Sequence, residues 1–200
     1  APVSDHEQLA KVRTKYGLPK DYILFLGTIE PRKNIPKIIT AYSKIARDLN
    51  GSKLVICGGY GWNAHKVYTT YNDLGLEDDV IFAGRVDEED KAAIYSGAKV
   101  FVFPSIFEGF GLPPLEAMAC GTPVVTSNSS SLPEVVGDAG KLVDHQNDDE
   151  IAEAILKLVK DDDMNAEFSA RGIKRAKKFT WKNAADQFIE LYKQIVDSRS

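Results

Sequence analysis

The chain has few cysteines and few histidines. Its only two cysteines, Cys57 and Cys120, lie far apart in apolar surroundings, so we expect buried thiols and not a disulfide or a metal site. The three histidines, His6, His65 and His145, are equally scattered and lack the spacing of metal ligands. The sequence therefore gives no indication of a bound metal.

A surplus of one charge and a long apolar run are also absent. The formal net charge is −4 with 27 % charged residues, which leaves no basic excess for binding the phosphate backbone of a nucleic acid. No apolar stretch is long enough to span a bilayer, and residues 1–6 resemble neither a signal peptide nor an anchor. We therefore expect a cytoplasmic protein without a nucleic-acid partner.

The sequence does contain enough apolar material for one folded domain. Its 200 residues, of which 44 % are hydrophobic, suffice for one well-buried α/β domain but not for two of ordinary size. No internal repeat or low-complexity tract divides the chain. A Gly-x-Ser-x-Gly sequence is missing too, so a serine hydrolase of the α/β type is not indicated.

Strands and helices alternate along the first three quarters of the chain. Short apolar runs typical of strands buried on both faces occupy residues 22–26, 53–57, 80–83, 100–103 and 123–126. Helical patterns lie at residues 35–48, 63–74, 88–96 and 113–120. This alternation predicts right-handed βαβ units in a Rossmann-like, doubly wound parallel sheet of the α/β class. Ligands of such sheets bind beyond the carboxyl ends of the strands.

From about residue 147 the pattern is helical only. We predict helices at residues 148–160, 164–178 and 180–196, with Thr180 as the N-cap of the last one. The last helix carries a broad apolar stripe made of Trp181, Ala185, Phe188, Leu191, Tyr192 and Ile195. The simplest expectation is that this stripe packs on the sheet domain.

A glycine-rich turn between two carboxylates is the most informative segment. Gly109 and Gly111 let a ligand approach the backbone closely, and either can adopt positive φ at little cost. The N–H groups of residues 110–112 and the dipole of the following helix would then face a crevice, which suits a diphosphate. Glu116, one turn further on, can accept hydrogen bonds from a ribose diol, and Glu108 can reach sugar hydroxyls.

A second charged segment follows the first strand. Asn34 can cap the helix that begins there, so we expect Arg32 and Lys33 at the rim of the same crevice. Two cations facing an anion pocket can neutralise a diphosphate and stabilise the charge that grows on it as a glycosidic bond breaks. Cations in a first helical turn oppose the helix dipole, and this unfavourable position favours a functional role over that of ordinary surface charges.

Together these segments resemble family 4 retaining glycosyltransferases. Residues 108–116 match the Glu-x7-Glu motif of that family, and residues 118–125 match the segment that follows it. Residues 26–34, 82–85 and 132–137 occur in the order that the family shows, so the resemblance covers nearly the whole chain.

The resemblance implies that this chain is half of an enzyme. Family members resemble two facing Rossmann-like domains, the GT-B arrangement, in which the amino-terminal half supplies the acceptor site and a catalytic histidine. The chain would then be the carboxyl-terminal, donor-binding half, and a missing amino-terminal acceptor domain would account for any membrane association. The implied parts are an interdomain segment at 1–20, an α/β core at 21–146, helices at 147–179 and a helix at 180–197 that crosses back onto the other domain.

The resemblance also implies the reaction, which is retaining transfer of a hexose from a nucleotide-diphosphate sugar to an acceptor hydroxyl, without a metal or other cofactor. We expect GDP-mannose as the donor, because the overall similarity is to mannosyltransferase-like members, and a UDP-sugar as the second choice. Arg32, Lys33 and Glu108 take the catalytic positions. The substrate-binding positions are Gly27, Thr28, Arg85, Gly109, Phe110, Gly111, Leu112 and Glu116. Thr28 departs from the family, since many members place an arginine there, and Arg85 would stack on the base or cover its edge.

Other functions stay open. Residues 59–64 match the G-x-G-x-x-A pattern of dinucleotide-binding proteins, but they follow the second strand and no acidic residue ends the next one. A glycosidase would use a pair of carboxylates but would leave the phosphate pocket unexplained. A non-catalytic nucleotide-sugar-binding module would have no exposed apolar face on its last helix, and the half-domain of a nucleotide-sugar epimerase would need no acceptor.

Overall fold

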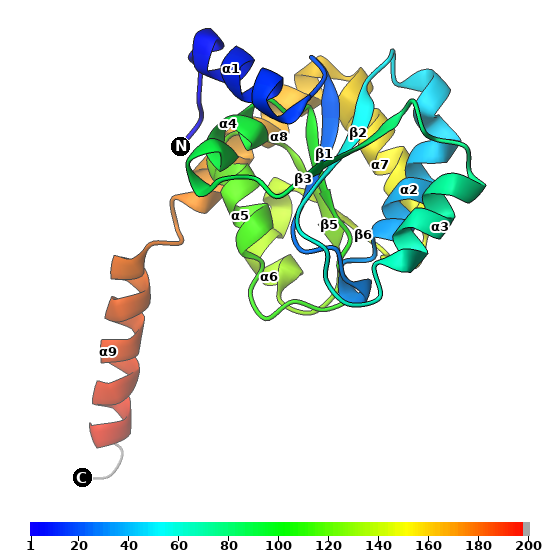
Figure 1. Cartoon of the computed structure of the whole chain (residues 1–200). Coiled ribbons are helices and arrows are strands. Elements are labelled where there is room, and N and C mark those ends of the chain that lie inside the picture. The colour runs from blue at the N-terminus through cyan, green and yellow to red at the C-terminus, as the bar shows by residue number, and fades with distance from the viewer. Residues whose placement is uncertain (198–200) are drawn as a thin grey trace.

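A six-stranded parallel sheet forms the centre of the fold (Figure 1). The computed structural model describes residues 1–197. The strands are β1 Tyr22–Leu26, β2 Lys53–Cys57, β3 Val80–Gly84, β4 Val100–Phe103, β5 Val124–Ser127 and β6 Lys141–Val143. Their order in the sheet is β3-β2-β1-β4-β5-β6, and every neighbouring pair is parallel. The predicted doubly wound α/β sheet is confirmed, and its direction of winding reverses between β1 and β4.

Helices cover both faces of the sheet (Figure 1). One layer contains α2 Ile35–Ile45, α3 His65–Asp73 and α7 Asp148–Lys160, and the other contains α4 Lys91–Ser96, α5 Leu112–Ala119, α6 Leu132–Val136 and α8 Asp162–Ala176. Helix α1 His6–Tyr16 packs against α4. Within residues 1–197 there are also four short 3₁₀ turns: η1 Pro31–Lys33, η2 Ala46–Asp48, η3 Glu88–Asp90 and η4 Gly137–Ala139.

Burial of the strands follows their place in the sheet. β1, β4 and β5 are buried along their whole length, because they lie inside the sheet between two layers of helices. β3 is an edge strand and only Val80 in it is fully buried, so the prediction of a strand buried on both faces is wrong there.

Aromatic rings pack around the junction of β1 and β4. Phe103 stacks against Phe25 at a centroid distance of 5.8 Å and against Phe101 at 5.7 Å. The prediction of two buried free thiols is confirmed, and burial raises the pKa of the Cys57 thiol to about 12. An aromatic part of the core therefore lies at β1 and β4, where the sheet reverses its winding, while the core as a whole extends over both faces of the sheet.

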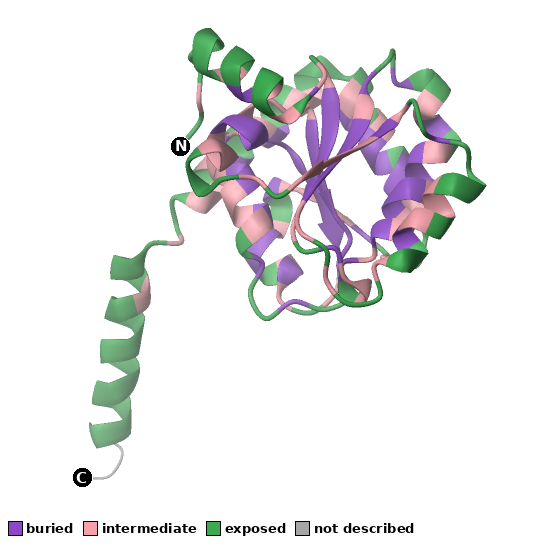
Figure 2. Cartoon of the chain, viewed as in Figure 1, coloured by how far each residue is buried: buried purple, intermediate pink, exposed green. Residues whose placement is uncertain are grey.

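Helix α9 Trp181–Asp197 projects away from the rest of the domain (Figures 1 and 2). The predicted cap is confirmed, because Thr180 Oγ1 accepts a hydrogen bond of 3.0 Å from the backbone N–H of Asn183. No residue of α9 is buried, and Trp181 at its start is 92 % exposed. The expectation that its apolar stripe packs on the sheet domain is therefore wrong.

Among residues 1–197, no helix combines the length and the apolar character needed to cross a membrane.

Candidate functional site

The loops at the carboxyl ends of β1, β4 and β6 are joined by hydrogen bonds. The side-chain amide of Asn34 donates to the carbonyls of Pro104, at 3.2 Å, and His145, at 2.7 Å. The backbone N–H of Ile106 donates to the carbonyl of Arg32 at 2.8 Å. Asn34 has a left-handed backbone and makes no side-chain cap to α2, so its predicted capping role is wrong. Its amide is used instead to hold three loops together.

The loops after β1 and β2 also run side by side. Ile29 forms an isolated parallel bridge with Tyr60. Gly58 has a φ of +151°, and a Cβ at this position would lie 1.9 Å from the carbonyl oxygen of Gly27, so only glycine fits. Contact with the loop after β2 therefore restricts the conformation of the loop after β1.

Close packing also explains one glycine of the 59–64 motif. A Cβ on Gly61 would lie 2.9 Å from the carbonyl oxygen of Ile29. A Cβ on Gly59 would lie 2.7 Å from Nε of Arg85, but that exposed side chain can move aside. The packing of the loops therefore accounts for Gly61 without a dinucleotide.

A cluster of charged side chains occupies the junction of the β1 and β4 loops. The carboxylate of Glu108 is only 8 % exposed. Its Oε1 lies 2.6 Å from Nζ of Lys33 and its Oε2 lies 2.9 Å from Nη1 of Arg32. The three predicted catalytic residues are thus brought into direct contact at the point where the winding of the sheet reverses, which is where ligands of such sheets bind.

The environment keeps Glu108 ionised. Burial would raise the pKa of its carboxyl, but hydrogen bonds from Lys33, Ser105 and Arg32 outweigh that effect and hold the pKa below its ordinary value. Oγ of Ser105 lies 2.7 Å from Oε1 of Glu108. At neutral pH this carboxylate can accept hydrogen bonds but has no proton to give.

The two cations have unequal access to solvent. The side chain of Arg32 is 45 % exposed, whereas that of Lys33 is 7 % exposed and its Nζ lies 4.7 Å from the ring centroid of Phe103. Both stand on the turn η1 before α2. The prediction that both cations lie at the rim therefore holds for Arg32 and is wrong for Lys33, because Glu108 and the Phe103 ring enclose its ammonium group.

A second carboxylate contacts Arg32. Oε1 of Glu30 lies 2.6 Å from Nε of Arg32, without hydrogen-bond geometry, so the attraction acts through charge. The charge cluster thus consists of Arg32, Lys33, Glu30 and Glu108, with two charges of each sign.

The glycine-rich turn leaves donors free. Gly111 precedes α5 at a φ of +108°, and a Cβ there would lie 2.9 Å from Cδ2 of Leu132. Gly109 has no positive φ, but nothing lies within 4 Å of the Cβ position, which leaves room for a ligand. Within the described part of the chain, the backbone N–H groups of residues 109–112 donate to no acceptor. The start of α5 therefore offers unpaired N–H groups of the kind that can accept an anion, and the predicted binding of a diphosphate there stays a prediction.

Serines from the loop after β5 hold this turn in place. The backbone N–H of Glu108 donates to Oγ of Ser130 at 3.0 Å. Oγ of Ser131 lies 2.8 Å from the carbonyl oxygen of Phe110 and 3.0 Å from that of Glu108. The free N–H groups therefore have a fixed direction.

Glu116 lies outside the charge cluster. Its half-buried carboxylate accepts a hydrogen bond of 3.0 Å on Oε2 from the hydroxyl of Tyr95, a buried residue of α4. Burial raises the pKa of the Tyr95 hydroxyl, and the charge of Glu116 adds to the effect, so this hydroxyl stays a donor. Within residues 1–197, Oε1 of Glu116 makes no hydrogen bond or ion pair, so it can accept a hydrogen bond from a ligand.

The other predicted binding residues lie on the surrounding loops. Thr28, Arg85, Phe110 and Leu112 are exposed, and Gly27 is half-buried. The ring of Phe110 meets that of Phe179, in the segment between α8 and α9, edge-on at a centroid distance of 6.0 Å. No contact joins Arg85 to the charge cluster in the described structure, so its predicted contact with a base stays a prediction.

Five residues of the site were not predicted from the sequence. They are Glu30, Tyr95, Ser105, Ser130 and Ser131. A signal exists for two of them, because residues 127–131 form a serine-rich run directly after the fifth strand. Tyr95 and Ser105 look like ordinary core residues until the partner of each hydroxyl is known.

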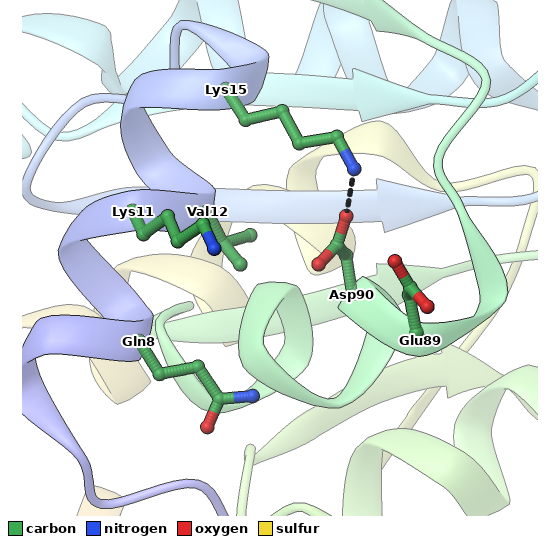
Figure 3. A pocket seen from close by; sticks show the side chains of 6 residues that line it. All are labelled: Gln8, Lys11, Val12, Lys15, Glu89 and Asp90. Carbon is green, nitrogen blue, oxygen red and sulfur yellow. Dashed lines mark hydrogen bonds and ion pairs between the residues drawn. The ribbon is translucent and has the colours of Figure 1, made fainter.

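A hollow of the surface lies away from these residues. It has a volume of about 280 Å³, lies beside α1 and η3, and is lined by Gln8, Lys11, Val12, Lys15, Glu89 and Asp90 (Figure 3). Nζ of Lys15 lies 2.6 Å from Asp90 and 2.7 Å from Asp87, so its charge is compensated.

Within residues 1–197, no group of three or more His, Cys, Asp and Glu side chains is arranged to hold a metal ion.

Comparison with known proteins places these features in a family. The sequence model described as "Glycosyl transferases group 1" matches residues 10–179. O-antigen chain mannosyltransferase B from Escherichia coli is 42 % identical over 186 residues, which cover 92 % of this chain and 49 % of the relative. A serotype-specific mannosyltransferase, WbdA from Escherichia coli, is 35 % identical over 195 residues, which cover 96 % of this chain and 24 % of the relative. The chain thus spans half or less of the length of these relatives.

Solved structures give the same result. Sucrose-phosphate synthase from Thermosynechococcus elongatus superimposes with a TM-score of 0.81 at 30 % identity, covering 98 % of this chain and 50 % of that structure. HepE from Anabaena, solved in complex with UDP and glucose, has a TM-score of 0.83 at 21 % identity and covers 95 % and 53 %, which shows likeness of fold. The predicted resemblance is confirmed, and the chain belongs to the glycosyl transferases group 1 family.

Proposed function

We propose that this chain is the donor-binding domain of a retaining glycosyltransferase, which transfers a hexose from a nucleotide-diphosphate sugar to an acceptor hydroxyl. The observation that carries the proposal is the contact of Arg32 and Lys33 with Glu108, next to the free N–H groups of residues 109–112. Cations, a fixed carboxylate and a helix start that can accept an anion meet there at one edge of the sheet.

The roles of these groups follow from their charges. As the bond from the anomeric carbon to the diphosphate breaks, negative charge grows on the leaving oxygen. Arg32 and the N–H groups of residues 109–112 stabilise that charge directly, while the buried Lys33 contributes mainly through its field. Glu108 orients sugar hydroxyls as an acceptor, since its carboxyl is ionised. We assign no enzymatic nucleophile, because the departing diphosphate can itself take the proton of the acceptor hydroxyl.

The donor is proposed to be GDP-mannose, with a UDP-sugar as the second candidate. The relatives named mannosyltransferases support this choice, since they are 42 % and 35 % identical to the chain. Glu116 would bind the ribose through its available oxygen, and Arg85 would lie against the base. We further propose that the reaction needs no metal ion and takes place in the cytoplasm.

The acceptor site is proposed to lie on a second domain. The relatives are at least twice as long as the matched segment, which leaves length for such a domain. The exposed apolar side chains of α9 are suited to pack on it. They also count against a self-sufficient nucleotide-sugar-binding module, for which no such exposed face is expected, and that module and the epimerase half-domain are not favoured.

Calorimetry tests the proposal. The chain would be titrated with GDP, UDP, ADP, NAD and GDP-mannose in the absence of metal, and the best ligand would be repeated on Arg32→Ala and Glu116→Ala. We expect selective binding of one nucleoside diphosphate, weakened by about 1–3 kcal/mol in each variant. Arg47→Ala removes an exposed arginine of η2 and serves as the control. Equal affinity of all four proteins would contradict the assignment of the site.

A further inference from the structure

One face of α8 and the turn after it carries a group of basic side chains. Arg171, Lys174, Arg175 and Lys178 are spaced i, i+3, i+4 and i+7, so they lie on the same side of the helix. With Asp138 they line a hollow of about 210 Å³. The chain as a whole carries a net charge of −4, so this concentration of positive charge is local. We call these five residues the basic hollow.

Backbone carbonyl groups hold the two arginines of the basic hollow in place. Arg175 donates to the backbone carbonyls of Val135, at 3.0 Å, and Glu134. Arg171 donates to the backbone carbonyl of Asp138 at 3.3 Å. Carbonyl groups accept hydrogen bonds from the guanidinium groups, but they are uncharged and do not cancel the positive charge of the arginines.

Acidic side chains near the basic hollow compensate little of its charge. Arg171 lies 3.9 Å from the carboxylate of Asp138, which is 87 % exposed, and 3.5 Å from that of Glu167. Such exposed pairs contribute little. In the described part of the chain, Lys174 and Lys178 have no acidic partner. Three N–H donors on each ammonium group are thus available for a ligand.

The helix dipole does not account for this arrangement. Cations near the carboxyl end of a helix interact favourably with the helix dipole. This interaction does not require the cations to lie on one face of the helix, and Lys177, which does not line the hollow, can also make it. Placing four cations at i, i+3 and i+4 spacings makes them repel one another. An anion in the hollow would remove this repulsion.

The basic hollow is separate from the charge cluster but adjoins the glycine-rich turn. No residue of the charge cluster lines it. The guanidinium of Arg175 lies 5.1 Å from the ring of Phe179, and that ring meets Phe110 of the turn. An anion bound here would therefore lie beside the donor site without occupying it.

We propose that the basic hollow binds a phosphate group, with Lys174 and Lys178 contacting its oxygens and the two fixed arginines supplying the surrounding positive field. Charge-assisted hydrogen bonds from several cations are the usual means by which proteins hold a phosphate. The group can belong to a free phosphorylated molecule or to the headgroup of an anionic lipid, and the same chemistry serves both.

The experiment compares two double charge reversals of equal size. Lys174→Glu/Lys178→Glu alters the basic hollow, whereas Lys160→Glu/Lys177→Glu changes the net charge equally at exposed lysines that do not line it. Each protein, after a check of its fold by circular dichroism, would be titrated with inorganic phosphate and mixed with vesicles of phosphatidylglycerol and phosphatidylcholine or of phosphatidylcholine alone. Arg32→Ala would be included to separate this site from the donor site.

We expect the wild type, the Lys160/Lys177 control and Arg32→Ala to bind phosphate or the anionic vesicles alike, and the Lys174/Lys178 variant to bind roughly tenfold more weakly. Binding of inorganic phosphate without vesicle binding would identify a free ligand, and the reverse would identify a lipid headgroup. The proposal is overturned if neither probe binds the wild type, or if both double variants lose binding equally. Loss of nucleotide binding in Arg32→Ala with phosphate binding retained would show that the two sites are independent.

Discussion

Glu108 holds the charge cluster together at the scale of single residues. Replacing it by Gln would leave the buried ammonium of Lys33 without its carboxylate, and losing one partner of a largely buried pair costs on the order of 3 kcal/mol. The pKa of Glu108 is lowered on folding. Its contribution to stability is therefore fully present above the ordinary pKa of 4.5 and is lost as pH falls through the lowered folded value.

The pH dependence gives a direct measurement. Urea unfolding of the wild type and of Glu108→Gln should show a large difference in the free energy of unfolding at pH 7 and a smaller one at pH 3, which lies below the ordinary pKa. Glu77→Gln, at an exposed carboxylate, should show little difference at either pH. An undiminished gap at pH 3 would mean that the ionised carboxylate is not what stabilises the site.

Tyr95 is expected to act through Glu116. Tyr95→Phe removes the hydrogen bond to its carboxylate and should weaken nucleotide binding by about 1 kcal/mol, if Glu116 binds the ribose as proposed. The informative readout is discrimination, because 2′-deoxy and 3′-deoxy nucleotides should lose less affinity in the variant than ribonucleotides do. An equal loss for all nucleotides would indicate that Tyr95 is merely structural.

Among the elements, the loop after β2 tolerates the least change. Gly58→Ala would place a methyl group 1.9 Å from the carbonyl oxygen of Gly27, so the two loops must separate, and we expect a loss of more than about 2 kcal/mol of stability. Gly109→Ala meets open space and should leave thermal unfolding unchanged while weakening nucleotide binding. Equal melting temperatures for both variants would contradict this account.

Sequence reasoning succeeded for elements with a long or regular pattern. The helix at 148–160 was predicted to the residue, and the strands at 22–26, 53–57 and 100–103 were as well. The strand β6 and the helix α6 were missed because three and five residues are too few to show a period. Helix α1 was missed because its apolar face is narrow, with Val12 buried and only Leu9 and Tyr16 half-buried beside it.

The same limits apply to the site. The glycine-rich turn and the cations were found because their residue types are informative in sequence. The burial of Lys33, the ion pair of Glu30 and the hydroxyl of Ser105 were not found, because each depends on which loops the sheet order brings together. Contacts between residues 75 positions apart, such as Lys33 and Glu108, leave no trace in local pattern.

On the scale of the whole molecule, α9 projects away from the sheet domain (Figure 1). None of its residues is buried, so ending the chain after Thr180 should change the stability of the domain by no more than about 0.5 kcal/mol. Thermal unfolding followed by circular dichroism measures this. The truncated chain should also be less prone to self-association in sedimentation velocity, since an exposed apolar face is removed. A large drop in melting temperature would show that α9 packs on the domain in solution.

The composition of the charge cluster also bears on how quickly a ligand arrives. Its two cations are balanced by two carboxylates, so the cluster adds no net charge of its own. Fast capture of a charged ligand requires a field of opposite sign that extends beyond the site. The cluster therefore gives an approaching diphosphate little long-range attraction, and its short-range hydrogen bonds hold the ligand only after arrival. In stopped flow, the association rate should be nearly the same for the wild type and for a variant in which Arg32 and Glu30 are both replaced by Ala, because that pair has no net charge.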